Sequence, residues 1–184
     1  MSFLTESRWG SLVCWRGERP EPAIASWLVD NQSLTKRLKA RSKHSFRVRL
    51  DSQRWERPLW NERQALTMPD RGVALVRKVH LLVDDIPVVY ARTVIPEATL
   101  SGKYRGLGSL GCRPLGEVLF ADPVMRRESM AFAQVKQGQN LYDEAMVGVD
   151  GDDCYSFWGR RSLFWLKQEC LLVSEFFLPN MNRL

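Results

Sequence analysis

The stretch VALVRKVHLLVDDIPVVYARTVIP, residues 73–96, decides the fold of this chain. It is rich in valine, leucine and isoleucine, and it is interrupted once, by DDIP at positions 84–87. β-branched and aliphatic residues favour strands, whereas aspartate and proline favour turns. The stretch therefore predicts two adjacent antiparallel strands joined by a tight turn.

The rest of the chain extends this hairpin into a sheet. WGRRSLFWLK at 158–167 and CLLVSEFFLP at 170–179 predict a closing hairpin, and RRESMAFAQV at 126–135 predicts a further strand. Helices are expected at 23–32 and at 34–41, where Ser33 is a suitable N-cap. These elements predict an α+β fold, a single antiparallel sheet of about six strands with a few helices, formed by one domain over residues 1–184.

The composition limits the class of protein. The chain has 184 residues, of which 45% are hydrophobic and 26% charged, which is enough for one sizeable core. We expect a cytoplasmic protein without stable membrane insertion, because no long apolar run and no signal peptide are apparent. The four cysteines are far apart and only two histidines are present, so no metal site or disulfide framework is expected. Asp150, Asp152 and Asp153 lack the ligand series of a calcium loop and indicate a solvated turn.

The net charge of +6 indicates an anionic partner, either nucleic acid, a membrane surface or a small acidic metabolite. Basic residues are densest at 36–57. Within that segment, apolar residues at 46, 48 and 50 alternate with Arg47 and Arg49, which favours a strand with one solvated face over a nucleic-acid stripe. Trp55 and Trp60 are interpreted as core residues, with a stacking surface as the alternative.

Two charged residues stand on otherwise apolar strand faces. Arg77 shares its face with four aliphatic residues of the strand at 75–83, and Glu175 is the only charge between positions 171 and 178. Removing a charge from water is costly unless an opposite charge faces it. Two interpretations remain open: Arg77 and Glu175 pair with each other, or both face an internal cavity whose ligand carries carboxylates. Arg92 is a further candidate cation whose face is ambiguous.

Gly106, Gly108 and Gly111 form the pattern G-x-G-x-x-G. A dinucleotide site requires such glycines directly after a strand and at the start of a long helix. Here the preceding strand ends near Pro96, and Pro114 interrupts any helix that continues from Gly111. The glycines are therefore expected to permit tight turns, either in a flap over a buried pocket or in an irregular surface loop.

Several segments, in order along the chain, resemble the chorismate pyruvate-lyases of ubiquinone biosynthesis. They are WLVDNQSLTKRL, LVRKVHLLVDDIPVVYARTVIPEATLSG, PLGEVLF, WGRRS and LLVSEFFLP. The resemblance implies that helix-turn-helix flaps cover an internal cavity beside the sheet. It also implies a lyase without a cofactor that converts chorismate to 4-hydroxybenzoate and pyruvate. We expect a monomer that binds no nucleic acid.

The resemblance further assigns roles to four residues. Arg77 matches an arginine that grips a ligand carboxylate, and Glu175 matches a glutamate at the ring hydroxyl. Leu115 matches a flap residue that contacts ligand. Leu34 matches a position occupied by methionine in another member, so a main-chain contact is expected there. The segment at 134–155 is longer than the family pattern, and its role is open.

The chemistry of these residues agrees with the resemblance. Chorismate carries two carboxylates, which suit a planar arginine. Loss of the enolpyruvyl group and a ring hydrogen makes the ring aromatic, so the reaction needs no metal or redox cofactor. Glu175 is a candidate for acid/base assistance or for positioning the hydroxyl. Two other classes are a non-catalytic sensor domain of the same fold and a nucleic-acid-binding protein that uses residues 36–57.

Overall fold

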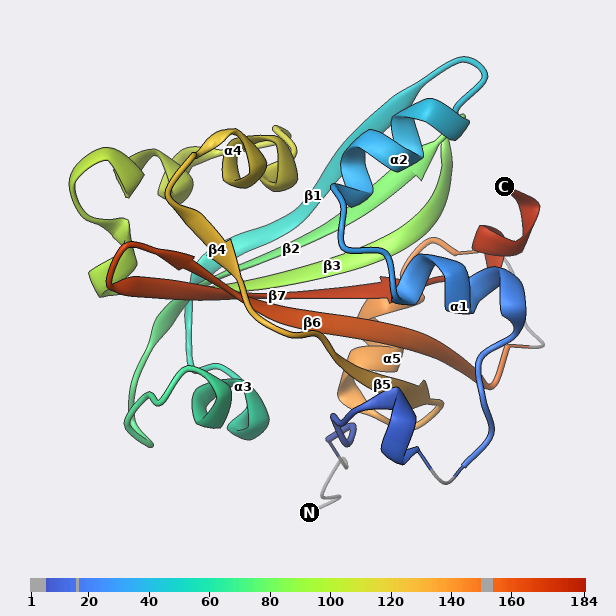
Figure 1. The fold of residues 1–184 in the computed structure, drawn as a ribbon, viewed down its shortest axis with the longest axis horizontal. Helices are drawn as coiled ribbons and strands as arrows, with labels where there is room; N and C mark the ends of the chain where they lie inside the picture. The colour runs from blue at the N-terminus through green and yellow to red at the C-terminus, as the bar shows by residue number, and fades with distance from the viewer. Residues whose placement is uncertain (1–5, 16, 150–153) are drawn as a thin grey trace.

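One antiparallel sheet of seven strands organises the protein (Figure 1). The structure, a computed structural model, describes residues 6–15, 17–149 and 154–184. Neighbouring strands follow the order β1-β2-β3-β7-β6-β4, and β5 also pairs with β6. The strands are β1 (Phe46–Glu56), β2 (Ala74–Val83), β3 (Ile86–Pro96), β4 (Met125–Arg127), β5 (Ala131–Lys136), β6 (Ser156–Leu166) and β7 (Glu169–Phe177).

The predicted hairpin forms the centre of the sheet as β2 and β3. Asp84 and Asp85 make its two-residue turn with φ angles of 50° and 67°, a left-handed conformation that aspartate tolerates better than most residues. The Asp84 carboxylate accepts hydrogen bonds from the backbone amides of Lys43, His44 and Ser45, which fixes the start of β1 to this turn. The closing hairpin is also confirmed, as β6 and β7.

Short helices cover both faces of the sheet (Figure 1). On one face, α1, α2 and α4 pack with residues such as Val79, Phe164 and Val173. On the other face lie α3 and α5. The Ser33 hydroxyl accepts the amide of Lys36 and caps α2, as predicted. The α-helices are α1 (Pro22–Leu28), α2 (Leu34–Arg41), α3 (Trp60–Ala65), α4 (Leu115–Ala121) and α5 (Asn140–Ala145), and the 3-10 helices are η1 (Leu12–Cys14), η2 (Glu97–Leu100), η3 (Gly102–Ser109) and η4 (Pro179–Arg183).

The structure confirms the predicted α+β fold with a single antiparallel sheet and refines its details. The sheet has seven strands, close to the expected six, because two short strands, β4 and β5, form where one strand was expected at 126–135. The segment at 134–155, whose role the sequence left open, contains α5. Trp55 and Trp60 are 50% and 60% exposed, so the interpretation of both as core residues was wrong. Asp150, Asp152 and Asp153 lie outside the described residues.

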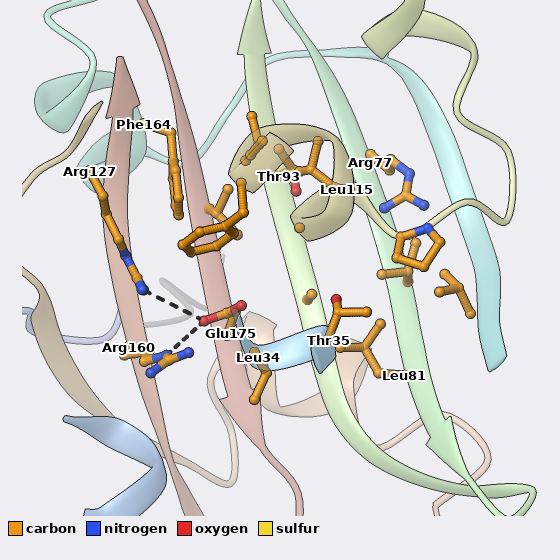
Figure 2. A pocket seen from close by; sticks show the side chains of 18 of the residues that line it. Leu34, Thr35, Arg77, Leu81, Thr93, Leu115, Arg127, Arg160, Phe164 and Glu175 are labelled. Carbon is orange, nitrogen blue, oxygen red and sulfur yellow. Dashed lines mark hydrogen bonds and ion pairs between the residues drawn. The ribbon is translucent and has the colours of Figure 1, made fainter. Parts of the chain in front are cut away.

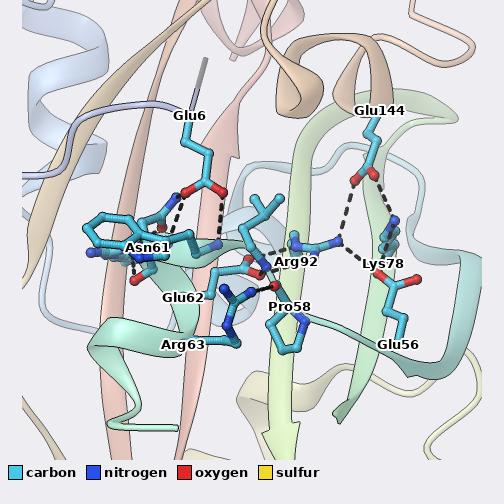
Figure 3. Close-up of polar contacts among 12 residues, drawn as sticks. Glu6, Glu56, Pro58, Asn61, Glu62, Arg63, Lys78, Arg92 and Glu144 are labelled. Atoms are coloured by element: carbon cyan, nitrogen blue, oxygen red, sulfur yellow. Dashed lines mark hydrogen bonds and ion pairs between the residues drawn. The ribbon is translucent and has the colours of Figure 1, made fainter. Parts of the chain in front are cut away.

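A buried polar cluster occupies the face covered by α3 and α5 (Figure 3). Arg92 donates from Nε and Nη2 to the two carboxylate oxygens of Glu62, at 2.7 and 3.0 Å. Glu144 of α5 accepts from Lys78 Nζ and from the Tyr90 hydroxyl, both at 2.7 Å. Burial and the Glu144 charge raise the pKa of Tyr90. Arg92 therefore belongs to this cluster. The sequence left open which face of the sheet Arg92 occupies, and the structure places it on the face covered by α3 and α5.

Several positive charges of the basic segment at 36–57 are paired with nearby carboxylates. Lys39 pairs with Glu117, Arg49 with Asp51, and Arg54 with Glu56. Such pairs are partly exposed and contribute little to stability. They do, however, reduce the unmatched positive charge available to a polyanion.

Candidate active site

A cavity lies between the sheet and the two short helices α2 and α4 (Figure 2). The space between its side chains amounts to about 550 Å³, part of it open to solvent. Its apolar lining comes from the sheet at Val48, Val79, Leu81, Ala91, Phe164 and Val173, and from the covering helices at Leu34, Leu115, Leu119 and Phe120.

Arg77 lies at one end of the cavity with part of its hydrogen-bonding capacity unused. The residue is only 2% exposed, and its Nη2 donates to the carbonyls of Gly111 and Arg113 at 2.9 and 3.0 Å. Its Nε is buried without a partner, and no carboxylate within the described residues lies within 4.0 Å of the guanidinium. Burial lowers the pKa of Arg77, because it disfavours the charged guanidinium. An anionic group in the cavity would supply the missing acceptor.

Glu175 lies toward the other end, beside two further arginines (Figure 2). Its Oε2 accepts from Arg160 Nε at 2.7 Å and lies 3.9 Å from Arg127 Nη2. Its Oε1 accepts no hydrogen bond within the described residues. Arg160, which is 1% exposed, also donates from Nη1 to the carbonyl of Trp27 at 2.8 Å and to that of Asp30. Glu175 is therefore held in place with one oxygen left for a ligand.

The strand register explains why these groups face each other across the cavity. Arg77 on β2 is opposite Thr93 on β3, and Thr93 is opposite Val173 on β7. Glu175 is two residues further along β7, on the same face of the sheet. Strands lie roughly 4.8 Å apart, so β2 and β7 are separated laterally by about 10 Å. A cyclic acid with polar groups at opposite ends of its ring fits this separation.

The covering helices approach each other closely at Gly116. A Cβ atom placed on Gly116 would lie 3.0 Å from Thr35 Oγ1, so a glycine permits this contact between α4 and α2. Lys39 of α2 and Glu117 of α4 form an ion pair at 2.6 Å on the outer side. Leu115 is buried and faces the cavity. The two helices therefore form a joint cover, which shields a ligand from water.

Charge and shape together define what the cavity can bind. Its lining contains three arginines, at 77, 127 and 160, and one glutamate, at 175, so its net charge is +2. Between these ends the walls are mainly apolar, with the hydroxyl-bearing residues Thr35 and Thr93 among them. A small cyclic acid with two negative charges matches this combination.

All four residues singled out from the sequence line this cavity: Leu34, Arg77, Leu115 and Glu175. The interpretation that Arg77 and Glu175 pair with each other was wrong, because Arg77 binds backbone carbonyls and Glu175 binds Arg160. The sequence analysis missed Arg160 and Arg127. Arg160 carries the same signal as Arg77, a charge on a strand face otherwise occupied by Trp158, Ser162 and Phe164.

The described part of the chain contains no group of three or more His, Cys, Asp or Glu side chains arranged to hold a metal ion. The cysteines Cys14, Cys112, Cys154 and Cys170 are free. In the same described residues, no helix is long and apolar enough to cross a membrane.

Comparison with known proteins identifies the family. The model of the family described as chorismate lyase matches residues 15–183. The chain belongs to the chorismate lyase family. This match begins directly after η1, reaches the end of η4 and includes every cavity residue named above.

Named relatives within this family cover most of the chain. A protein named "Probable chorismate pyruvate-lyase" from Thiobacillus denitrificans is 40% identical over 156 residues, which is 85% of this chain and 82% of the relative. One with the same name from Methylococcus capsulatus is 39% identical over 156 residues, covering 85% and 94%. Another, from Nitrosomonas eutropha, is 35% identical over 158 residues, covering 86% and 88%.

Solved structures share the fold of this chorismate lyase family member at low sequence identity. PhnF from Mycobacterium smegmatis superposes with a TM-score of 0.60 at 13% identity, covering 83% of this chain and 66% of PhnF. The effector domain of PhnF gives a TM-score of 0.57 at 12% identity, covering 83% and 91%. At such identities the likeness concerns the α+β architecture alone.

Proposed function

We propose that this protein is a chorismate pyruvate-lyase, which converts chorismate to 4-hydroxybenzoate and pyruvate. The observation that carries the proposal is the position of Arg77 and Glu175 at opposite ends of one covered cavity. Membership of the chorismate lyase family and the names of relatives that are 35% to 40% identical support the same activity.

Each end of the substrate has a complementary group in the cavity. Chorismate has a ring carboxylate at one end and a ring hydroxyl on the opposite carbon. We assign the carboxylate to Arg77, whose Nε is unpaired, and the hydroxyl to Oε1 of Glu175. Leu115 and Leu34 cover the ring from α4 and α2. The product keeps both polar groups, so it occupies the same position.

The reaction requires orientation more than strong chemical assistance. The C4–H bond and the ether bond at C3 break, the electron pair of the C–H bond forms the new ring double bond, and the ring becomes aromatic. The enolpyruvyl group leaves with the electron pair of the ether bond, and its methylene carbon gains a proton to give pyruvate. Holding the dianion in a reactive geometry and excluding water are the contributions expected from this cavity. Glu175, already bound to Arg160, positions the C4 hydroxyl.

The cover over the cavity has a consequence for turnover. Substrate entry and product exit require α2 and α4 to separate, because the first residues of these helices, Leu34 and Leu115, are buried over the cavity. Product release therefore contributes to the turnover rate, as in other enzymes with closing lids. We place the reaction in the cytoplasm, as the source of 4-hydroxybenzoate for ubiquinone, with the chain acting as a monomer and no cofactor taking part.

The direct test is incubation of the purified protein with chorismate. Formation of 4-hydroxybenzoate is followed by absorbance, and pyruvate is measured by coupling to lactate dehydrogenase and NADH oxidation. The proposal predicts the two products in equal amounts. Tight binding of 4-hydroxybenzoate without any turnover of chorismate, at high protein concentration, would instead identify a non-catalytic sensor.

A further inference from the structure

We propose that Arg127 binds the enolpyruvyl carboxylate of chorismate and so lets the cavity distinguish the dianionic substrate from the monoanionic product. This inference rests on the proposed lyase function and adds a third anchoring residue to the two already assigned. It follows from the position of Arg127, from its free donors and from the charge of the cavity.

The position of Arg127 is beside the place assigned to the ring hydroxyl. β4 pairs with β6, where Arg127 is opposite Phe164, and the guanidinium carbon lies 5.1 Å from the centre of that ring. Its Nη2 is 3.9 Å from Glu175 Oε2 (Figure 2). In chorismate, the carbon that bears the enolpyruvyl ether is adjacent to the carbon that bears the hydroxyl. A hydroxyl at Glu175 therefore brings the second carboxylate within reach of Arg127.

Arg127 also has donors to spare, and weaker contacts hold it than hold Arg160, although Nη2 of Arg160 also makes no hydrogen bond within the described residues. Arg160 uses Nε for Glu175 and Nη1 for the backbone carbonyls at the end of α1. Arg127 donates from Nε to Ser162 Oγ at 3.0 Å, and Nη1 makes a long contact of 3.4 Å with the Asn31 carbonyl. Its Nη2 makes no hydrogen bond within the described residues.

Burial makes an anionic partner for Arg127 favourable. The side chain is 12% exposed, and burial lowers the pKa of its guanidinium, an effect that Glu175 opposes only partly. With three arginines and one glutamate, the cavity has a net charge of +2, which a dianion neutralises and a monoanion does not. Once pyruvate has left, the charge of Arg127 is again unmatched. Arg127 is therefore expected to contribute to substrate binding and little to product binding.

The test uses two stable ligands that differ in a single ring substituent, the ether group that carries the second carboxylate. They are 4-hydroxybenzoate and its 3-carboxymethoxy derivative, which carries an acid next to the hydroxyl. Dissociation constants are measured by calorimetry for the wild type, Arg127→Gln, Arg127→Lys and the control Arg126→Gln. Arg126 is the exposed neighbour on β4, so the control makes the same change of charge away from the cavity. Thermal unfolding checks that each variant is folded.

We expect Arg127→Gln to weaken binding of the derivative about 100-fold, because it removes a charge-assisted hydrogen bond, and to change 4-hydroxybenzoate binding less than about threefold. Arg127→Lys should recover part of the loss, and Arg126→Gln should leave both constants unchanged. Equal losses for the two ligands, or no loss for the derivative, would overturn the proposal. Because these are binding measurements, failure of the wild type to turn over chorismate would count against the lyase function separately.

Discussion

Arg160 and Glu175 face each other on neighbouring strands, and the arginine donates from Nε to Oε2 of the glutamate at 2.7 Å. The same guanidinium binds the carbonyls of Trp27 and Asp30. One buried residue thus holds a ligand-facing carboxylate and the end of α1, the helix that leads into the cavity cover. Loss of Arg160 should lower the stability of the fold, whereas loss of the Glu175 charge should mainly weaken the interaction with the ligand.

This difference can be measured by urea denaturation. Arg160→Gln should lower the free energy of unfolding by about 3 kcal/mol, because it leaves the glutamate without its main partner and the carbonyls without a donor. Glu175→Gln should lower it by only about 1 kcal/mol, because the amide oxygen still accepts from Arg160. That variant should nevertheless lose most of its activity on chorismate. Equal destabilisation by the two changes would refute the division of roles.

Replacement of Arg77 by lysine should cost most of the activity. An ammonium group has no planar fork, so it cannot serve the carbonyls of Gly111 and Arg113 together with a ligand carboxylate. We expect kcat/KM for chorismate to fall about 100-fold. Steady-state kinetics provide the measurement, and circular dichroism should show an unchanged fold. Wild-type turnover in Arg77→Lys would remove the role assigned to this residue.

The contact between the two covering helices predicts a variant that releases product faster. In Gly116→Ala the new Cβ meets Thr35 Oγ1 at 3.0 Å, so α4 and α2 must move slightly apart. Overpacking of this kind costs on the order of 1 kcal/mol, which corresponds to about fivefold faster dissociation of 4-hydroxybenzoate. Stopped-flow fluorescence measures the rate.

Gly106→Ala is the matched control for this prediction. A Cβ at Gly106 meets no atom within 4 Å, and the residue lies in η3, which precedes α4 in the chain and does not line the cavity. Its dissociation rate should equal that of the wild type. If both variants release product at the wild-type rate, the closeness of α2 and α4 has no bearing on release.

Asp84 predicts a specific response to acid. Its backbone hydrogen bonds to Ser45, His44 and Lys43 lower the pKa of the carboxyl from 3.8 to about 2. A lowered pKa in the folded state means that the ionised form stabilises the protein above pH 4, and that this contribution disappears as the pH falls toward 2. Asp84→Asn should therefore be less stable than the wild type at pH 7 and should differ less from it at pH 2. Thermal unfolding at the two pH values measures this, and a constant difference would contradict it.

The alternation of apolar and polar residues along the long strands allowed the two hairpins and two of the cavity residues to be predicted. The hairpins at β2–β3 and β6–β7 follow from runs of β-forming residues, and Arg77 and Glu175 were found because each interrupts an apolar face. Arg160 satisfies the same criterion, but Arg161 is adjacent to it, and two consecutive arginines point to opposite faces of a strand. The sequence analysis therefore did not predict which of these two arginines lines the cavity.

Short elements and sheet edges explain where the sequence analysis and the structure differ. β4 has three residues, too few for alternation to reveal the face on which Arg127 lies. α5 has six residues, fewer than two turns, and its Leu141 and Ala145 are buried by packing against the sheet, which a local pattern does not show. Trp55 and Trp60 are hydrophobic but lie on the edge strand β1 and at the start of α3, where few neighbours cover them.

The central claim is that Arg77 and Glu175 hold opposite ends of the same small acid. A crystal structure of the complex with 4-hydroxybenzoate tests it most directly. The account predicts the carboxylate within hydrogen-bonding distance of Arg77 and the hydroxyl on Oε1 of Glu175, with Leu115 over the ring. A ligand bound in the reverse orientation, or outside the cavity between the sheet and the helices α2 and α4, would contradict it.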